Sequence, residues 1–521
     1  MPLTLSMTTM PLTPLFPSAR AAQHAGRLLS LAPLLAAVML AGCASTGGVR
    51  PTAQTVGPAQ LGLSSSPADF PKDNWWTSFH SPELDRLVTQ ALADNPSLQE
   101  AQARMRQAQA AVGVAQSSLE PQLGAAVNST RQRFSENDIY PPPLGGGVYT
   151  ENQALLQGSY TLDFFGRNRA QLQAAVGQAR AAQAQAQAGR VLLAANVAGA
   201  YINLARLTAQ RAVLHKTLQQ RQDIERLVSD RVRTGLETTL QQRQAQAEIP
   251  QIRLQLEQNA QSMEQARHAL AALLGRGPGE TQSLSPSLGT MPMPALPQTL
   301  PAALIGRRAD VVAARWQVQS ALAGVKAARA AFYPNISLTA FAGFTALGFS
   351  QFLTTGSRAY GVGPALTLPI FEGGKLRANL RGQAAAADAA IDQYNATLVN
   401  AVREVADAVS DRRSLQAQIV QQQKALSLAQ DAFTLAQKRY GAGLGNYLNV
   451  LTTENAVLQL EQAGADLKAQ ALVDDVALIR ALGGGYAAQA LPQAAGPASA
   501  AAPAPSAGVL QGGVNTATAR R

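Results

Sequence analysis

The chain has 521 residues and a formal net charge of +11, with only 5% aromatic and 14% charged residues. This length is too great for one ordinary globular domain, and two to four structural units are expected. The low aromatic content favours long helices of small residues over a thick aromatic core. No run of lysine and arginine with interleaved aromatic residues indicates a nucleic-acid-binding face. The charge is therefore interpreted as a mildly basic, solvated surface.

An apolar run of about 13 residues, Leu28 to Leu40, follows Arg20 and Arg27. It is too short to span a bilayer, which takes about 20 residues, but it has the length of a signal-peptide core. The run ends in LAGC, which resembles a bacterial lipobox. This resemblance implies that residues 1–42 are a signal peptide and that Cys43, the only cysteine, carries a covalent lipid. An ordinary signal peptide that happens to contain a cysteine is the alternative.

The residue after the cysteine is Ala44 rather than Asp, which in lipoproteins of this type implies the outer membrane. Residues 43–72 are expected to form a lipid-anchored flexible tether. Residues 484–521, rich in Ala, Pro and Gly, are expected to be a disordered C-terminal tail. No other segment is apolar enough for a membrane helix, so any membrane-spanning element is expected to be a β-structure.

An internal duplication is indicated by three segments that occur twice in the same order. Repeat 1, residues 73–284, is expected to be joined to repeat 2, residues 302–483, by a proline-rich linker, residues 285–301. The matching segments are residues 115–123 with 328–336, residues 161–165 with 367–371, and residues 230–240 with 438–448.

Each repeat is expected to contain a short helix, a strand–loop–strand unit, a long helix and a shorter return helix. Prolines and glycines set the boundaries, because proline interrupts a helix and glycine favours turns. Each long helix should reach roughly 100 Å at 1.5 Å per residue. The expected ranges are strand–loop–strand 121–165, long helix 168–234 and return helix 240–274 in repeat 1, then 334–371, 375–440 and 447–482 in repeat 2.

The expected strands alternate between apolar and polar residues. Leu156, Tyr160 and Leu162 share one face, and Gln157, Ser159, Thr161 and Asp163 share the other. Such alternation is typical of a water-filled membrane barrel, although a half-buried soluble hairpin gives the same pattern. Four strands cannot close a barrel, and an open sheet would leave unpaired backbone groups in lipid. We therefore expect a dimer, trimer or tetramer, with eight, twelve or sixteen strands.

Four segments resemble the TolC-like outer-membrane factor family, in its lipoprotein branch of OprM- and NodT-type efflux proteins. The resemblance covers about residues 72–483. It implies a mixed α+β membrane protein: a homotrimer whose twelve-strand transmembrane β-barrel, with four strands per chain, continues into a long periplasmic α-helical barrel. One departure is Ala309, where relatives often have proline, and it is expected to matter little. The segments are residues 300–338, 160–170, 367–380 and 439–451.

The resemblance also implies the function. Family members are outer-membrane channels of tripartite efflux systems, passive exit ducts that carry drugs or other small molecules from the periplasm to the exterior. Their partners are a periplasmic adaptor and an inner-membrane pump of the RND or major-facilitator type. A type I secretion exit duct and a non-transport trimeric envelope stalk are the alternatives.

The turns between the long and return helices are the adaptor-docking sites that the resemblance implies. They contain Gly235 and Leu236 in repeat 1, and Gly443 and Leu444 in repeat 2. Glycine lets the backbone turn without a Cβ penalty and lets a partner helix approach closely. Glycines that merely cap helices are the alternative.

The resemblance implies a periplasmic gate formed by Tyr440, Leu448 and Thr452. Thr452 stands where relatives often have aspartate, so weak binding of multivalent cations is expected. Glu454 is near, but two residues further on it points about 200° away on a helix.

Catalytic chemistry is not indicated. The four histidines are isolated, and no Cys/His spacing suggests a metal site. The cluster GAGLG, residues 441–445, falls in a helix–helix turn rather than between a strand and a phosphate-binding helix. Asp407 and Asp411 are interpreted as a solvated or pore-facing stripe rather than a glycosidase pair. We expect no enzyme activity, no cofactor other than the lipid on Cys43 and no metal.

Overall fold

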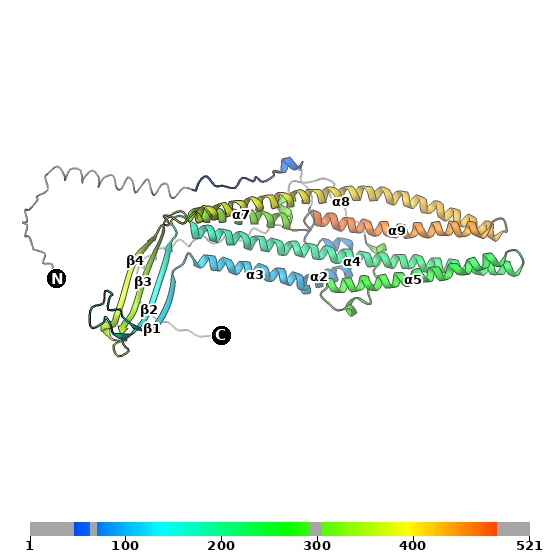
Figure 1. Ribbon diagram of the computed structural model, residues 1–521. Coiled ribbons are helices and arrows are strands. Elements are labelled where there is room, and N and C mark those ends of the chain that lie inside the picture. Colours follow the sequence, from blue (N-terminus) through cyan, green and yellow to red (C-terminus); the bar gives the residue numbers. More distant parts are fainter. Residues whose placement is uncertain (1–45, 63–69, 292–303, 487–521) are drawn as a thin grey trace, which may run out of the picture.

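The computed structural model describes residues 46–62, 70–291 and 304–486. The helices run beside one another in an elongated body, and a β-sheet projects from one end of it (Figure 1). The expected signal peptide, Cys43 and the tail beyond residue 486 lie outside the described residues.

The two repeats contain the same elements in the same order, except that before the short helix repeat 1 has the 13-residue α2 and repeat 2 the four-residue α6. Short 3-10 helices are η1 (Pro58–Leu61), η2 (Trp75–Phe79), η3 (Pro278–Thr281), η4 (Leu288–Thr290) and η5 (Thr355–Ser357). Repeat 1 contains α2 (Pro82–Asp94), α3 (Pro96–Ser117), β1 (Gln122–Arg133), β2 (Val148–Leu162), α4 (Arg167–Arg233) and α5 (Thr239–Leu273). Repeat 2 contains α6 (Leu304–Arg307), α7 (Ala309–Ala330), β3 (Asn335–Leu347), β4 (Arg358–Thr367), α8 (Lys375–Gly441) and α9 (Tyr447–Ala481).

The strands end earlier than the sequence pattern predicted. β2 ends at Leu162, and Asp163 does not belong to the polar face of the strand. Its carboxylate instead accepts hydrogen bonds from the backbone N–H groups of Asn168 (3.1 Å) and Arg169 (2.9 Å) in the first turn of α4. Such a side chain satisfies N–H groups that have no partner within the helix. In repeat 2, β4 ends before Pro369, which lacks the N–H needed to continue a ladder.

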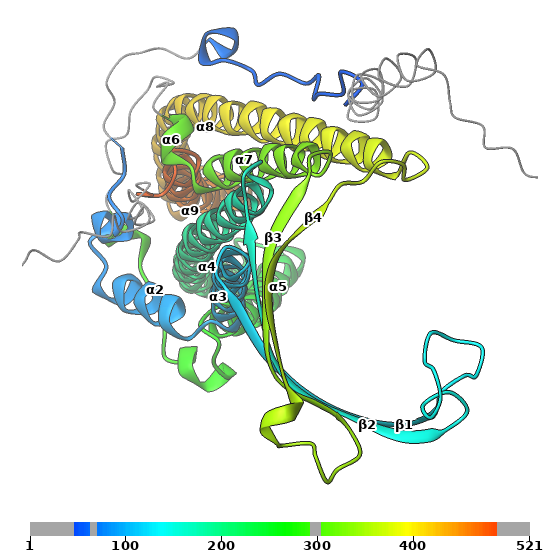
Figure 2. The same cartoon turned by 90° about the vertical axis from the view of Figure 1, so that its left-hand side faces the viewer.

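The sheet is antiparallel in the order β1-β2-β3-β4, so the hairpins of the two repeats meet where β2 pairs with β3. Directly opposite residues of paired strands point to the same face, and the register gathers apolar side chains on one face and polar ones on the other. Figure 2 shows that the sheet is curved. The apolar face includes Leu123, Val127, Leu156, Tyr160, Leu338, Val362 and Leu366, and the polar face includes Gln122, Asn128, Gln153, Gln157, Ser159, Ser337 and Thr339.

The largest buried cluster surrounds the middle of α4, where α2, α5 and α9 pack together with Trp75 and Trp76. Contrary to the expectation that the mature chain has no stretch apolar enough for a membrane helix, α4 contains an 18-residue window with a mean hydropathy of 1.3. The apolar character follows from packing, since 56% of that window is buried inside the protein.

Residues 46–62, expected to be part of a flexible tether, lie along α7 and α8. The Asp388 carboxylate accepts hydrogen bonds from the backbone N–H groups of Thr52 (2.7 Å) and Ala53 (2.8 Å). The Asn395 side chain accepts a hydrogen bond from the Val56 N–H at 2.9 Å. These contacts fix the segment to α8, and the Phe70 ring lies 5.0 Å from the Arg307 guanidinium, so only residues 43–45 and 63–69 stay an expected tether.

Candidate functional site

The polar face of the sheet carries a hollow of about 580 Å³. Its walls are mainly amides, hydroxyls and glycines, because alternate residues of each strand turn their polar side chains to this face. Leu155 and Phe341 are large apolar side chains among the polar residues of this face. The sheet therefore presents a concave polar surface on one side and an apolar surface on the other.

The two turns at the far end of the helical body have the same geometry. Gly235 follows α4 with φ +75°, and Gly443 follows α8 with φ +79°. The Leu236 N–H donates to the Arg231 carbonyl, and the Leu444 N–H donates to the Arg439 carbonyl, both at 2.8 Å. This bond pattern with a left-handed glycine is a Schellman cap.

The expected docking leucines at these turns are on the surface. Leu236 is 65% exposed and Leu444 is 71% exposed. A Cβ atom added at Gly235 or Gly443 would meet nothing within 4 Å. The turns therefore leave open space around each glycine. Their positive φ angles alone account for glycine at both positions.

The three expected gate residues are divided between the interior and the surface. Tyr440 is 1% exposed, whereas Leu448 is 60% exposed. Thr452 is exposed, and its hydroxyl donates to the Leu448 carbonyl at 2.9 Å. Residues four apart lie on one side of a helix, so Leu448 and Thr452 form one exposed face of α9, while Tyr440 packs beneath it.

Tyr440 links the ends of the two long helices. The Arg231 guanidinium lies 4.8 Å from the centroid of the Tyr440 ring. Its Nη1 also donates to the Tyr440 carbonyl at 3.2 Å. Burial and the nearby charge of Glu237 raise the pKa of Tyr440 to about 12. The phenol is therefore neutral at physiological pH, and Arg231 ties α4 to the last turn of α8.

Glu454 is buried, and its carboxylate faces α4. It is 2% exposed, and its Oε2 lies 3.4 Å from Nε of Arg221. Arg221 also forms an ion pair with Glu248 of α5. Burial, opposed by Arg221, raises the pKa of Glu454 to about 7. Glu454 therefore points away from the exposed face of α9 that carries Thr452, as the helical spacing predicted. Its carboxyl group does not supply an acid at the position of Thr452.

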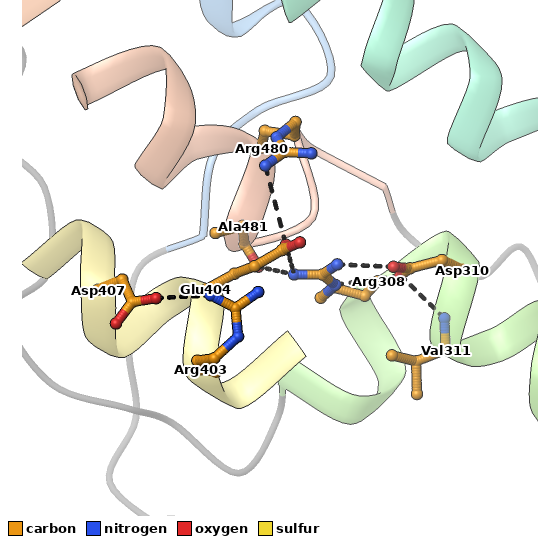
Figure 3. Close-up of polar contacts among 8 residues, drawn as sticks. All are labelled: Arg308, Asp310, Val311, Arg403, Glu404, Asp407, Arg480 and Ala481. Atoms are coloured by element: carbon orange, nitrogen blue, oxygen red, sulfur yellow. Dashed lines mark hydrogen bonds and ion pairs between the residues drawn. The ribbon is translucent and has the colours of Figure 1, made fainter. Parts of the chain in front are cut away.

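A second charge cluster surrounds the buried Arg308, which precedes α7 and lies at the end of α9 (Figure 3). Its Nη2 contacts Asp310 at 2.6 Å, and its Nη1 contacts Glu404 of α8 at 2.9 Å. Nη1 also donates to the Ala481 carbonyl at 3.2 Å. Burial would raise the pKa of Asp310, but the hydrogen bonds and charge of Arg308 outweigh it and lower that pKa. Arg308 therefore joins α7, α8 and α9.

The sequence analysis did not predict either charge cluster. Arg308 and Asp310 flank Ala309 within the resembling segment 300–338, where neither was singled out, and Glu404 lies almost a hundred residues away. Arg221 and Glu454 are even further apart, so no local spacing could reveal their contact. Over the described ranges, no group of three or more His, Cys, Asp or Glu side chains could hold a metal ion.

A sheet with one polar and one apolar face, joined to helices of 67 residues, defines the class of outer-membrane channels that extend into the periplasm. The sequence model for "Outer membrane efflux protein" matches residues 87–276 and 300–484, one segment in each repeat. The chain belongs to this family. It is an outer-membrane efflux channel protein.

Two curated relatives and one solved structure illustrate the similarity. The chain is 35% identical over 362 residues to the fusaric acid resistance protein FusA of Burkholderia cepacia, covering 68% of each chain. It is 30% identical over 480 residues to the multidrug resistance outer membrane protein MdtP of Escherichia coli K12, covering 89% of this chain and 97% of MdtP. The crystal structure of the outer membrane protein VceC of Vibrio cholerae matches with a TM-score of 0.76 and 36% identity, covering 80% of this chain and 100% of VceC.

Proposed function

We propose that three copies of the chain form a twelve-strand transmembrane barrel that continues into a periplasmic helical barrel. The observation that carries this proposal is the two-faced sheet, whose outer strands β1 and β4 each pair on one side only within the described chain. An unpaired backbone group in lipid costs several kcal/mol. Pairing β4 of one copy with β1 of the next removes both edges and turns the polar face inward.

Cross-linking tests the trimer. Cysteine pairs placed along β1 and β4 and oxidised in the membrane should give a ladder of covalent bands that ends at three copies. Cys43 is the only natural cysteine, so single-site variants in a Cys43→Ser background serve as controls for background bands. A ladder that ends at two or four copies would exclude the trimer.

The assembled channel is proposed to be a passive exit duct for drugs or other small molecules. It would act with a periplasmic adaptor and an inner-membrane pump of the RND or major-facilitator type. The names of FusA and MdtP support small toxic molecules as cargo of those relatives. A strain that lacks its own outer-membrane channel should regain drug resistance when complemented with this gene. Unchanged susceptibility at normal expression in the outer membrane would contradict the duct.

Adaptor docking is proposed at Gly235, Leu236, Gly443 and Leu444. The exposed leucines support this site. A Gly443→Trp variant would strain the turn itself, because a residue with a Cβ is disfavoured at positive φ, so the double variant Leu236→Ser/Leu444→Ser is the sharper test. It should abolish drug efflux while trimers persist. Leu254→Ser, at a leucine of α5 that is 59% exposed, is the matched control and should leave efflux unchanged.

The periplasmic gate is proposed at Tyr440, Leu448 and Thr452. In a trimer, three copies of the exposed face of α9 would narrow the duct, with Tyr440 packed behind them. Leu448→Ala should therefore raise single-channel conductance. Thr452→Asp should introduce block by a trivalent cation added on the periplasmic side, because three carboxylates attract cations. Strong block of the parent channel would contradict the neutral gate.

Lipidation is proposed at Cys43, which lies outside the described residues. The position of the cysteine directly after the small residues of the signal peptide supports it. Metabolic labelling with a radioactive fatty acid should label the parent chain and not Cys43→Ser. Label retained in the variant would overturn the assignment.

A further inference from the structure

One buried guanidinium lies where the two helical hairpins, α4–α5 and α8–α9, pack together. The Arg221 side chain is 3% exposed. Its guanidinium contacts the carboxyl groups of Glu248 of α5 and Glu454 of α9. Its Nη2 also donates to the Asn455 side chain at 2.5 Å. Three helices of one chain therefore meet at this guanidinium, about two turns of α9 from the α8–α9 turn.

The cluster contains two carboxylates for one buried cation. The Glu248 side chain is 19% exposed and keeps contact with water. The Glu454 side chain is 3% exposed. A second negative charge without water or a cation of its own is unfavourable in the interior. Glu454 is therefore the carboxyl that holds a proton while the hairpins are packed.

The groups around Glu454 come from every helix that packs there. α4 presents Arg221 and α5 presents Glu248, and α9 itself presents Tyr447, whose ring lies 6.4 Å from that of Tyr440 on α8. Burial raises the pKa of Tyr447 to about 12 and that of Glu454 to about 7. Of these two shifted groups, Glu454 changes its charge near neutral pH and Tyr447 does not.

We propose that Glu454 is a proton-controlled latch between the α4–α5 and α8–α9 hairpins. When protonated, it lets the hairpins pack tightly. When ionised, it leaves a buried uncompensated charge and loosens the contact. Because this contact lies about two turns of α9 from the α8–α9 turn, it would control how closely the tips of the two hairpins approach each other.

The direction of the pH effect follows from the pKa values. The packed carboxyl, with a pKa of about 7, binds a proton more tightly than a solvated glutamate with its ordinary pKa of 4.5. Protons therefore favour the packed form. The packing should be tightest at or below pH 4.5, weaken as the pH rises to about 7 and change little above that.

Hydrogen exchange of the purified full-length protein tests the latch. Exchange rates are measured between about pH 4.5 and 8.5 and corrected for the intrinsic pH dependence of amide exchange. Peptides of α5 and α9 around Glu248 and Glu454 should lose protection as the pH rises and reach a plateau near 7. Glu454→Gln, which mimics the protonated form, should keep high protection throughout.

The matched control is Glu461→Gln. Glu461 also lies on α9 and pairs across to α4, with Lys216 at 2.6 Å, and its side chain is 13% exposed. Removing its charge should leave the pH profile of the parent protein unchanged. A flattened profile in this variant would show that any loss of charge at the interface has the same effect, and would overturn the specific role of Glu454.

Glu248→Gln gives an independent test that does not depend on the folding of Glu454→Gln. With Glu248 neutral, Arg221 is available to Glu454 alone, so Glu454 should ionise more readily. The plateau should then be reached at a lower pH. A parent protein without pH-dependent protection, or a Glu248→Gln profile that does not move, would overturn the latch.

Discussion

The two repeats solve the same structural problem with different chemistry. In each, the short helix begins where the return helix ends, and the residue before the short helix donates a hydrogen bond to the last carbonyl of the return helix. In repeat 1, the Asn95 amide donates to the Leu273 carbonyl at 2.9 Å. In repeat 2, the Arg308 guanidinium donates to the Ala481 carbonyl at 3.2 Å. Both junctions need such a donor, because a helix leaves its final carbonyl groups without intrahelical partners.

The surroundings explain why one junction uses an amide and the other a guanidinium. In repeat 1, α2 ends directly before Asn95 and packs against α4 with buried apolar residues such as Leu84, Leu87 and Val88. In repeat 2, only the four-residue α6 is described in the corresponding place, and Arg308 instead has carboxylates on two sides. The comparison teaches that two chemically different side chains can bond the equivalent carbonyl of the return helix while the repeated backbone is preserved.

The largest expected effect is a difference in stability loss between variants of the two junctions. Arg308→Ala removes the cation that Asp310 and Glu404 share and leaves only Arg480, 3.9 Å from Glu404, nearby. It should lower the free energy of unfolding by about 2–3 kcal/mol, within the range for lost hydrogen bonds to charged groups, because both carboxylates keep contact with water. Asn95→Ala removes a helix cap and should cost about 1 kcal/mol. Thermal unfolding of the detergent-purified variants, followed by circular dichroism, measures both.

A triple neutral variant controls for the charge argument. Arg308→Met combined with Asp310→Asn and Glu404→Gln removes the cation and both carboxylates together. It should recover part of the stability that Arg308→Ala loses, because both carboxylates are gone and only Arg480, which is 40% exposed, loses a partner. Equal losses for Arg308→Ala and Asn95→Ala would show that the two junctions are energetically alike, and the comparison would fail.

The next effect concerns the glycines that follow the two return helices. A Cβ atom at Gly483 would lie 1.9 Å from the Arg307 carbonyl oxygen, whereas one at Gly275 would lie 3.0 Å from the Asp94 carbonyl oxygen. Both glycines have positive φ, so alanine should cost roughly 1–2 kcal/mol at Gly275 and clearly more at Gly483. Gly279→Ala, with open space around its Cβ, should be nearly neutral. Thermal unfolding of the three alanine variants measures these losses of stability. Equal losses for Gly275→Ala and Gly483→Ala would contradict the difference in packing.

Much of this architecture could be predicted from the sequence because it depends on short-range patterns. Period-two alternation predicted both faces of the sheet, as the register from Ala154 to Phe344 shows. Prolines and glycines placed the ends of the long and return helices within one residue of the structure. The assignment of Asp163 to a strand was wrong, because alternation cannot distinguish a polar strand residue from a side chain that caps the next helix.

Helix α2 was not predicted, although the sequence contains its start signal. Ser81 precedes Pro82, and the Ser81 hydroxyl accepts a hydrogen bond from the Leu84 N–H at 3.3 Å. Serine before proline at the first helical position is a recognised helix start. The charge clusters at Arg221 and Arg308 offered no comparable signal, because their partners come from helices distant in the sequence.

The smallest expected effect on stability concerns the two tip turns, where the repeats have the same geometry and should respond alike to substitution. The tip turns share a positive-φ glycine, the same hydrogen-bond pattern and open space at the Cβ. Gly235→Ala and Gly443→Ala should therefore each cost about 1 kcal/mol, which is the penalty of a left-handed alanine without a steric clash. The two single costs should be similar, and the double variant should cost their sum to within about 0.5 kcal/mol, as is usual for independent sites. Thermal unfolding of the two single variants and the double variant measures them. A much larger cost at Gly443 would mean that the α8–α9 turn makes contacts in the assembled protein that the α4–α5 turn does not, and the repeats would then differ at their tips as well as at their junctions.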